Sequence, residues 1–220
     1  YSILCYSNNF CHYFDFIMIR HFIKPLNVLL AGYSYLKSSF SGKPEVMGMP
    51  VSVSMELTNI CNLHCPECSS GSGRIQRERG YMDIDLFKKV IKELSPYLYN
   101  TNMYFQGEPM LHPLFFSFLA NTVNTHTTVS TNGHFLSLEN SEKIVRSGLN
   151  HLLISLDGLD QETYATYRKS GNLNKVIEGI KNVAEAKRRF NSNLKLEIQF
   201  LVNKMNEHQI LRIKELAKIV

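Results

Sequence analysis

Five repeats of a strand followed by a helix, all after residue 50, constrain the fold of this chain more than any other feature. Residues 51–57 alternate strictly between apolar and polar side chains, which is typical of a strand with two distinct faces. Because a helix follows each expected strand, the strands should run parallel and be joined by right-handed crossovers. Strands are expected at 51–57, 102–106, 126–131, 151–156 and 194–202, and helices at 84–94, 114–123, 137–148, 175–190 and from 206 onward.

Residues suited to cap helices mark several of these boundaries. Asp83, Ser137 and Asn206 each precede an apolar helical pattern, and their side-chain oxygens can accept hydrogen bonds from the free N–H groups of a first turn. Gly148 follows the third helix, where a glycine can adopt the left-handed conformation that ends many helices. These signals predict where three helices begin and where one ends.

The unusual motifs of the sequence all follow directly on expected strands. A doubly wound sheet and a partial (βα) barrel both place active sites at such strand ends, but a barrel gathers its loops around one mouth. We therefore expect an α/β fold, a partial (βα)6 TIM-like barrel of parallel strands in residues 51–220, truncated after its fifth βα unit. Residues 1–50 are expected to form a helical leader, and the chain starts at Tyr1, so Met18 is an alternative true start.

The composition is that of an ordinary globular protein. Apolar residues make up 44% and charged residues 20% of the 220 positions. The net charge of +5 is mild, and its densest patch, 187–189, closes an expected helix without the aromatic residues that accompany nucleic-acid binding. Charged residues and Pro25 interrupt the apolar stretch 14–30, so we expect no membrane span there, but an amphipathic segment or a helix packed on the domain.

The five cysteines argue against a secreted disulfide scaffold. Three of them lie within eight residues, and the total is odd. We therefore expect a reducing, cytoplasmic location. Cys5 and Cys11 lie in the leader and are expected to be free thiols rather than metal ligands.

Cys61, Cys65 and Cys68 form the most informative segment. Their C-x3-C-x2-C spacing follows the first expected strand, so three thiols can converge on one inorganic centre. Thiolates are the usual ligands of iron–sulfur clusters, and three thiolates on a four-iron cluster leave one iron open to another ligand. The alternative is a zinc site with His64 as the fourth ligand. Against zinc, no second cysteine pair follows, and the adjacent His64 and Cys65 would be awkward ligands of one ion.

This cysteine motif resembles that of the radical S-adenosylmethionine (radical SAM) superfamily, and the resemblance covers about 51–206. Gly107-Glu108-Pro109 ends the second expected strand, as the GEP motif of that family does. Residues 130–133 and 154–158 end the third and fourth strands, and Arg168 follows. The pattern looks closest to the branch with a C-terminal SPASM domain, which includes peptide-modifying maturases. One departure is Glu67, where many relatives have an aromatic or apolar residue near the adenine.

The resemblance implies a [4Fe–4S] cluster held by the three cysteines, with S-adenosylmethionine bound beside it. Glu108 is suited to accept hydrogen bonds from the methionine ammonium, and the Gly107 carbonyl can come close because glycine has no side chain. Arg168 is suited to bind the methionine carboxylate through two hydrogen bonds. Thr131 and Ser155 are small hydroxyls that could contact ribose or carboxylate oxygens.

The function that the resemblance implies is reductive cleavage of S-adenosylmethionine into a 5′-deoxyadenosyl radical, which abstracts hydrogen from a substrate. The expected partners are S-adenosylmethionine, a reductant such as flavodoxin or ferredoxin, and a peptide or protein substrate, as in SPASM maturases. No nucleic-acid partner is expected. The alternatives are another radical SAM class, an activase or a cofactor-biosynthesis cyclase, and a non-catalytic zinc-binding module.

Overall fold

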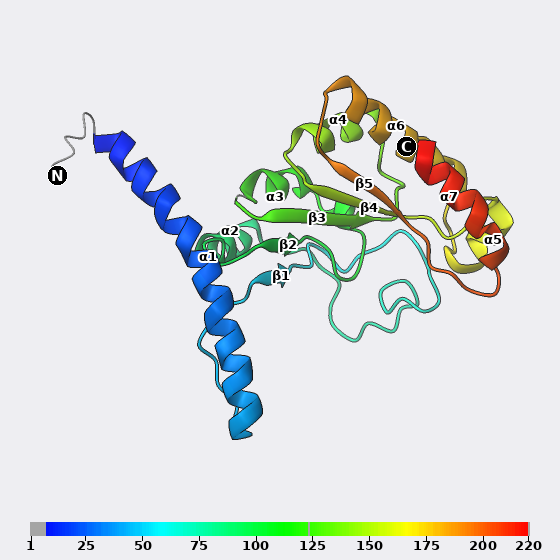
Figure 1. Ribbon diagram of the computed structural model, residues 1–220. Helices are drawn as coiled ribbons and strands as arrows, with labels where there is room; N and C mark the ends of the chain where they lie inside the picture. The colour runs from blue at the N-terminus through cyan, green and yellow to red at the C-terminus, as the bar shows by residue number, and fades with distance from the viewer. Residues whose placement is uncertain (1–7, 123, 220) are drawn as a thin grey trace.

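A parallel five-stranded sheet forms the centre of the protein (Figure 1). The computed structural model describes the backbone of residues 8–122 and 124–219 and the side chains of 22–122 and 124–218. A doubly wound sheet reverses its strand order at a switch point, whereas here each strand pairs in parallel with the next one along the chain. The predicted α/β partial-barrel class is therefore confirmed. The order runs through β1 (Ser52–Ser54), β2 (Asn100–Asn102), β3 (His126–Thr131), β4 (His151–Ser155) and β5 (Lys195–Gln199).

Helices link successive strands, as the sequence predicts. Figure 1 shows helices α3, α4 and α6 along one face of the sheet, and α4 and α6 pack on each other. The helices are α1 (Asn8–Ser41), α2 (Ile84–Leu94), α3 (Phe115–Asn121), α4 (Leu138–Arg146), α5 (Gln161–Tyr167), α6 (Leu173–Arg189) and α7 (Ile210–Ile219), with short 3-10 turns at η1 (Pro109–Leu111) and η2 (Glu207–Gln209).

The hydrophobic core lies between the sheet and these helices. Phe87 of α2 and Phe118 of α3 are fully buried, with their rings edge to face and their centroids 4.8 Å apart. Ile144 of α4, Ile180 of α6 and Leu152 of β4 belong to the same buried cluster. Burial of each such side chain stabilises the fold by about 1.5–3 kcal/mol relative to exposure. This packing holds the strand ends in fixed relative positions.

Two of the three predicted helix caps are confirmed. The Asp83 side chain accepts hydrogen bonds from the backbone N–H groups of the first turn of α2, and the Ser137 hydroxyl does the same for α4. Gly148 follows α4 with φ +81°, in the left-handed region predicted for it. Local sequence signals therefore predicted these boundaries correctly.

The predicted cap at Asn206 is wrong. Its side chain makes no capping hydrogen bond to the turn that it precedes. Instead, the buried Asn206 amide donates to the carbonyl oxygens of Asp157 (3.1 Å) and Leu201 (2.9 Å), and its oxygen accepts from Asn203 N (2.7 Å). These three hydrogen bonds occupy the Asn206 side chain, so it does not cap the helix. They tie the loop after β5 to the end of β4.

The second strand is also shorter and earlier than predicted, ending at Asn102 rather than at residue 106. Met103 N still donates to Thr128 O (2.8 Å), but Phe105 is 72% exposed and Gln106 N donates to the Glu56 carboxylate (3.0 Å). The chain therefore leaves the sheet after Met103 and turns toward the cysteine-bearing loop. The sequence reading missed helix α5, which is capped by Asp160: the Asp160 side chain accepts from Thr163 N (2.8 Å).

The leader forms the long helix α1, and its placement as a separate domain stays a prediction. Lys24 of α1 contacts the domain: its ammonium donates to the Asn124 carbonyl (2.5 Å) and lies 5.6 Å from the centre of the Tyr99 ring. Among the described residues, none of the helices has both the length and the apolarity needed to cross a membrane. The predictions for Cys5 and Cys11 fall outside the residues whose side chains are described.

Replacing Asn206 by alanine should destabilise the protein by about 2–3 kcal/mol, because buried backbone groups of Asp157, Leu201 and Asn203 lose their partners. Asp83→Ala is the matched control, since loss of a cap at a helix end costs about 1 kcal/mol. Urea unfolding followed by circular dichroism compares the two. Equal losses would mean that Asn206 acts as an ordinary cap.

Candidate active site

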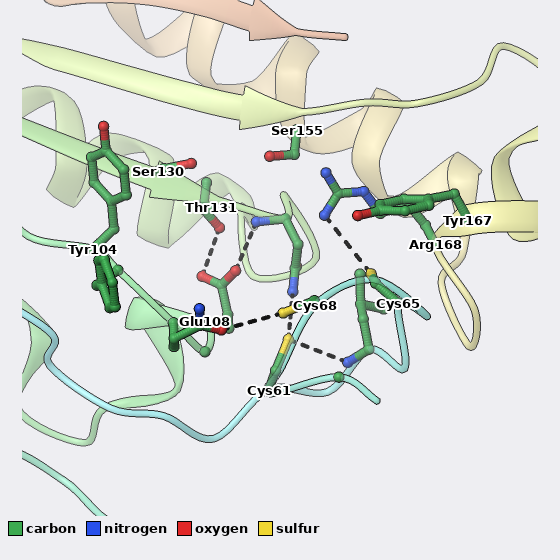
Figure 2. A pocket seen from close by; sticks show the side chains of 16 residues that line it. Cys61, Cys65, Cys68, Tyr104, Glu108, Ser130, Thr131, Ser155, Tyr167 and Arg168 are labelled. Carbon is green, nitrogen blue, oxygen red and sulfur yellow. Dashed lines mark hydrogen bonds between the residues drawn. The ribbon is translucent and has the colours of Figure 1, made fainter. Parts of the chain in front are cut away.

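A cavity of about 160 Å³ lies at the C-terminal ends of β1 to β4. It gathers side chains from four successive strand ends and from the segment after α5, as a barrel mouth should. All eight residues that the sequence singled out line it. They are Cys61, Cys65, Cys68, Gly107, Glu108, Thr131, Ser155 and Arg168, and Figure 2 shows the side chains of most of them pointing toward one centre.

The three cysteine thiols lie on one side of this cavity (Figure 2). Burial raises the pKa of Cys61 to about 11 and also raises that of Cys65, where Arg168 partly offsets the rise. Thiolates buried without a cation are costly, so a bound metal centre would supply the positive charge that this donor set needs. Thiol donors with few protein partners fit an iron–sulfur cluster.

N–H groups point at two of these sulfurs. Leu63 N lies 3.4 Å from the Cys61 sulfur, and the Asn132 side-chain amide lies 3.8 Å from the same atom. The Arg168 guanidinium approaches the Cys65 sulfur to 4.0 Å. Donors of this kind stabilise negative charge on cluster-bound sulfur and tune its potential.

His64 lies away from the cavity, which disfavours the zinc alternative. Its ring nitrogen Nδ1 is 3.0 Å from the Ser170 hydroxyl, and the side chain is exposed. Within the described side chains, no three Cys, His, Asp or Glu are placed to hold a single metal ion. Three thiolates on a cluster bind three different irons and need not meet at one point. The position of His64 therefore disfavours the zinc alternative.

Gly107 holds the end of β2 against the start of the cysteine loop. Its φ is +72°, and a Cβ atom there would lie 2.3 Å from Thr58 O and 2.8 Å from Ile60 O. The next residue, Glu108, donates its backbone N–H to Ile60 O (2.8 Å). Only glycine satisfies both the backbone angle and the close approach. The sequence reading explained this glycine by ligand access alone, and the packing adds a second reason.

Glu108 is a buried acceptor that faces the end of β3 (Figure 2). Its Oε1 accepts from the Thr131 hydroxyl (2.7 Å) and from Met110 N (3.1 Å), and its Oε2 accepts from Asn132 N (2.7 Å). A carboxylate offers about four acceptor positions, so one on Oε2 stays open. Burial nevertheless raises the pKa of Glu108 to about 7. A bound ammonium would lower that pKa and keep the carboxylate ionised.

Arg168 has a partner that the sequence reading missed. Its Nε donates to Oδ2 of Asp157 at 2.5 Å, and the Asp157 side chain is fully buried. Oδ1 of Asp157 accepts from Leu201 N (2.8 Å). Paired in this way, Arg168 keeps its charge in a buried setting and leaves N–H groups on its two Nη atoms for a ligand. The only sequence signal was the place of Asp157 in the 154–158 motif.

Asn132 was also missed as a site residue, although it lies in the 130–133 motif. Its side chain donates to Oδ1 of Asn62 (2.8 Å) within the cysteine loop, and its backbone N–H donates to Glu108. The Thr131 hydroxyl donates its hydrogen to Glu108, so toward a ligand it can only accept a hydrogen bond. The Ser155 hydroxyl, in contrast, makes no hydrogen bond to any described residue and stays free for one.

Glu67 does not line this cavity. It lies 3.7 Å from Arg74, and both side chains are exposed. It borders a second cavity of about 430 Å³, formed by residues 201–205 and by Tyr167, which lines both cavities.

Comparison with known proteins gives the family. The model of the "Radical SAM superfamily" matches residues 55–217. AdoMet-dependent heme synthase of Methanosarcina barkeri is 28% identical over 77% of this chain and 47% of its own length, and PqqA peptide cyclase of Bradyrhizobium diazoefficiens is 27% identical over 76% and 43%. Streptococcus suis SuiB, solved with S-adenosylmethionine, superposes with a TM-score of 0.65 at 16% identity over 83% of this chain and 40% of its own.

The chain belongs to the radical SAM superfamily. The members of that family use a [4Fe–4S] cluster and S-adenosylmethionine, so the predicted family and the predicted cofactors are confirmed. The likeness to SuiB adds support for the fold alone. The chain spans less than half the length of these relatives, and the roles of individual site residues stay predictions.

Gly107→Ala should prevent assembly of the site, because the added Cβ would collide with the backbone of Thr58 and Ile60. Gly148→Ala is the matched control: its φ is also positive, but nothing lies within 4 Å of the added Cβ. The control should lose only about 1 kcal/mol of stability and keep the cluster. Iron content after anaerobic reconstitution measures the difference. Normal iron content in Gly107→Ala would show that the contact is dispensable.

Proposed function

We propose that this chain binds a [4Fe–4S] cluster through Cys61, Cys65 and Cys68 and uses it to cleave S-adenosylmethionine reductively. The observation that carries this proposal is the single cavity that joins the three thiols to the other predicted strand-end residues. When bound, the reduced cluster supplies the electron that converts S-adenosylmethionine into methionine and a 5′-deoxyadenosyl radical, which then abstracts hydrogen from a substrate.

The residues of this chain position and shield the reactants. The open acceptor position of Glu108 and the Gly107 carbonyl suit the methionine ammonium, while the Nη atoms of Arg168 suit its carboxylate. Ser155 can donate to a ribose or carboxylate oxygen, and Thr131 can accept from a hydroxyl. Opposite charges at the two sides of one cavity would fix the orientation of a zwitterionic ligand.

We further propose a peptide or protein substrate in the manner of SPASM maturases, with flavodoxin or ferredoxin as reductant in the cytoplasm. The name of PqqA peptide cyclase, a relative over most of this chain, supports a peptide. The name of AdoMet-dependent heme synthase supports the competing class, a cofactor-biosynthesis enzyme that acts on a small molecule. Release of 5′-deoxyadenosine in the presence of candidate peptides, with dithionite as electron donor, separates the two classes.

Cys65→Ala should abolish the cluster, because one of its three cysteine ligands is lost and the iron that Cys65 would hold is left without a protein ligand. Cys11→Ala should leave the iron content unchanged. The measurement is iron and acid-labile sulfide after anaerobic reconstitution, where about four iron atoms per chain are expected for the wild type. A full cluster in Cys65→Ala would mean that the ligands are misassigned, and zinc as the native metal would support a binding module instead.

Glu108→Gln and Arg168→Ala should each weaken S-adenosylmethionine binding more than about tenfold, since loss of one partner of a desolvated charge pair costs about 2–5 kcal/mol. Cluster content should stay normal in both variants. Arg146→Ala, at an exposed position on α4, is the control. Titration of the reconstituted proteins with S-adenosylmethionine tests this. Wild-type affinity in both variants would remove the two residues from the binding site.

A further inference from the structure

A chain of hydrogen bonds runs from the start of α6 to the cysteine loop through two side chains, His134 and Asn132. The ring nitrogen Nε2 of His134 lies 2.8 Å from the backbone nitrogen of Asn172, the residue that caps α6. The other ring nitrogen, Nδ1, lies 3.0 Å from Oδ1 of Asn132. The Asn132 amide nitrogen in turn lies 2.8 Å from Oδ1 of Asn62 and 3.8 Å from the sulfur of Cys61.

The direction of this chain follows from its first donor. A backbone N–H can only donate, so the Nε2 atom that faces Asn172 N must be an unprotonated acceptor. The one hydrogen of the neutral His134 ring is then on Nδ1, where it points to Oδ1 of Asn132, with the Asn132 carbonyl oxygen at 3.2 Å as a second acceptor. Burial lowers the pKa of His134, and the hydrogen bond to Asn132 only partly offsets this, which favours the neutral ring.

The amide of Asn132 could face the cysteine loop with either its oxygen or its nitrogen. Asn62 does not decide between the two, because it also carries an amide and can turn to offer a donor or an acceptor. His134 does decide, because its ring N–H and its backbone N–H (3.1 Å) both donate to Oδ1 of Asn132. With the oxygen held on that side, the N–H groups of Asn132 face Asn62 and the sulfur of Cys61.

An N–H group that faces a cluster-bound sulfur affects the reduction potential of the cluster. Reduction adds negative charge, which the N–H stabilises, so the potential rises. Hydrogen bonds in series also polarise one another, so donation from the His134 ring to the Asn132 oxygen strengthens the amide N–H on the far side. Without the ring, the backbone N–H of His134 would hold that oxygen alone.

We propose that His134 is a positioning residue: through Asn132 it directs an N–H at the sulfur of Cys61 and thereby raises the reduction potential of the cluster. His134 is not among the residues that line the cavity, so it acts without touching S-adenosylmethionine or the cluster. This role rests on the proposed function, since it requires a cluster on Cys61.

An anaerobic redox titration of the reconstituted protein tests this role. The electron paramagnetic resonance signal of the reduced cluster is followed in the absence of S-adenosylmethionine. His134→Ala should lower the midpoint potential by at least about a threefold change in the redox equilibrium constant, about 28 mV for a one-electron couple. Asn132→Ala should lower it by at least as much. His126→Ala, at an exposed position at the other end of β3, is the matched control and should leave it unchanged.

A double variant separates action through Asn132 from a direct effect of the ring. If His134 acts through Asn132, the variant with both alanines should have the potential of Asn132→Ala alone, because coupled residues are not additive. His134→Asn should restore most of the wild-type potential, since its amide nitrogen can take the place of Nδ1 and donate to Asn132. His134→Gln, whose amide takes the place of Nε2, should not restore it.

Iron content and circular dichroism are measured for every variant, so that a change in potential is not loss of fold. Wild-type potential in His134→Ala with a full cluster would overturn the positioning role and leave the proposed function intact. So would additive shifts in the double variant. If His134→Ala takes up no cluster, His134→Asn and His134→Gln decide, and equal potentials in these two would overturn the role. A wild-type protein that takes up no cluster would overturn the proposed function and this role together.

Discussion

The close contact between Gly107 and the backbone of Thr58 and Ile60 is the constraint on which the site depends. The cysteine loop has little regular structure, so its own hydrogen bonds cannot fix the thiols relative to the sheet. The space beside Gly107 has no room for a Cβ atom, and the Glu108 N–H closes the same junction by donating to Ile60 O. Together with the hydrogen bond from Asn132 to Asn62, this junction fixes the cysteine loop relative to the sheet, and precise placement of this kind is what a cluster site requires.

Two buried polar clusters line the cavity: the one around Glu108 offers a hydrogen-bond acceptor to a ligand, and the one around Arg168 offers donors. Around Glu108, the Thr131 hydroxyl and two backbone N–H groups satisfy the carboxylate, while Asp157 balances the charge of Arg168. Inside a protein such groups interact strongly because little water screens them, and each would be costly without its partner. The Glu108 cluster joins the ends of β2 and β3, and Asp157 also holds Leu201 after β5. The polar interactions thus fix the mouth in the way that the apolar core fixes the body of the domain.

The sequence predicted what depends on local rules and missed what depends on contacts between distant segments. Alternation and helical spacing gave the order and type of most elements, and the caps Asp83 and Ser137 need only their own first turns. β2 was misplaced because 103–106 has the composition of a strand, yet the contact of Gln106 with Glu56, 50 residues away, decides its path. Asn206 was misread for the same reason, since its partner Asp157 lies 49 residues away. Asp157 was missed although its partner Arg168 lies only 11 residues further on, because no helical or strand spacing brings the two together.

The carboxylate of Asp157 has a consequence beyond the placement of Arg168. One of its oxygens holds the guanidinium beside the first cavity, and the other holds Leu201, in the loop that borders the second cavity. The same buried carboxylate therefore anchors a wall of each cavity, and Asp157 connects the two cavities through two hydrogen bonds. A substitution at Asp157 would remove both anchors at once.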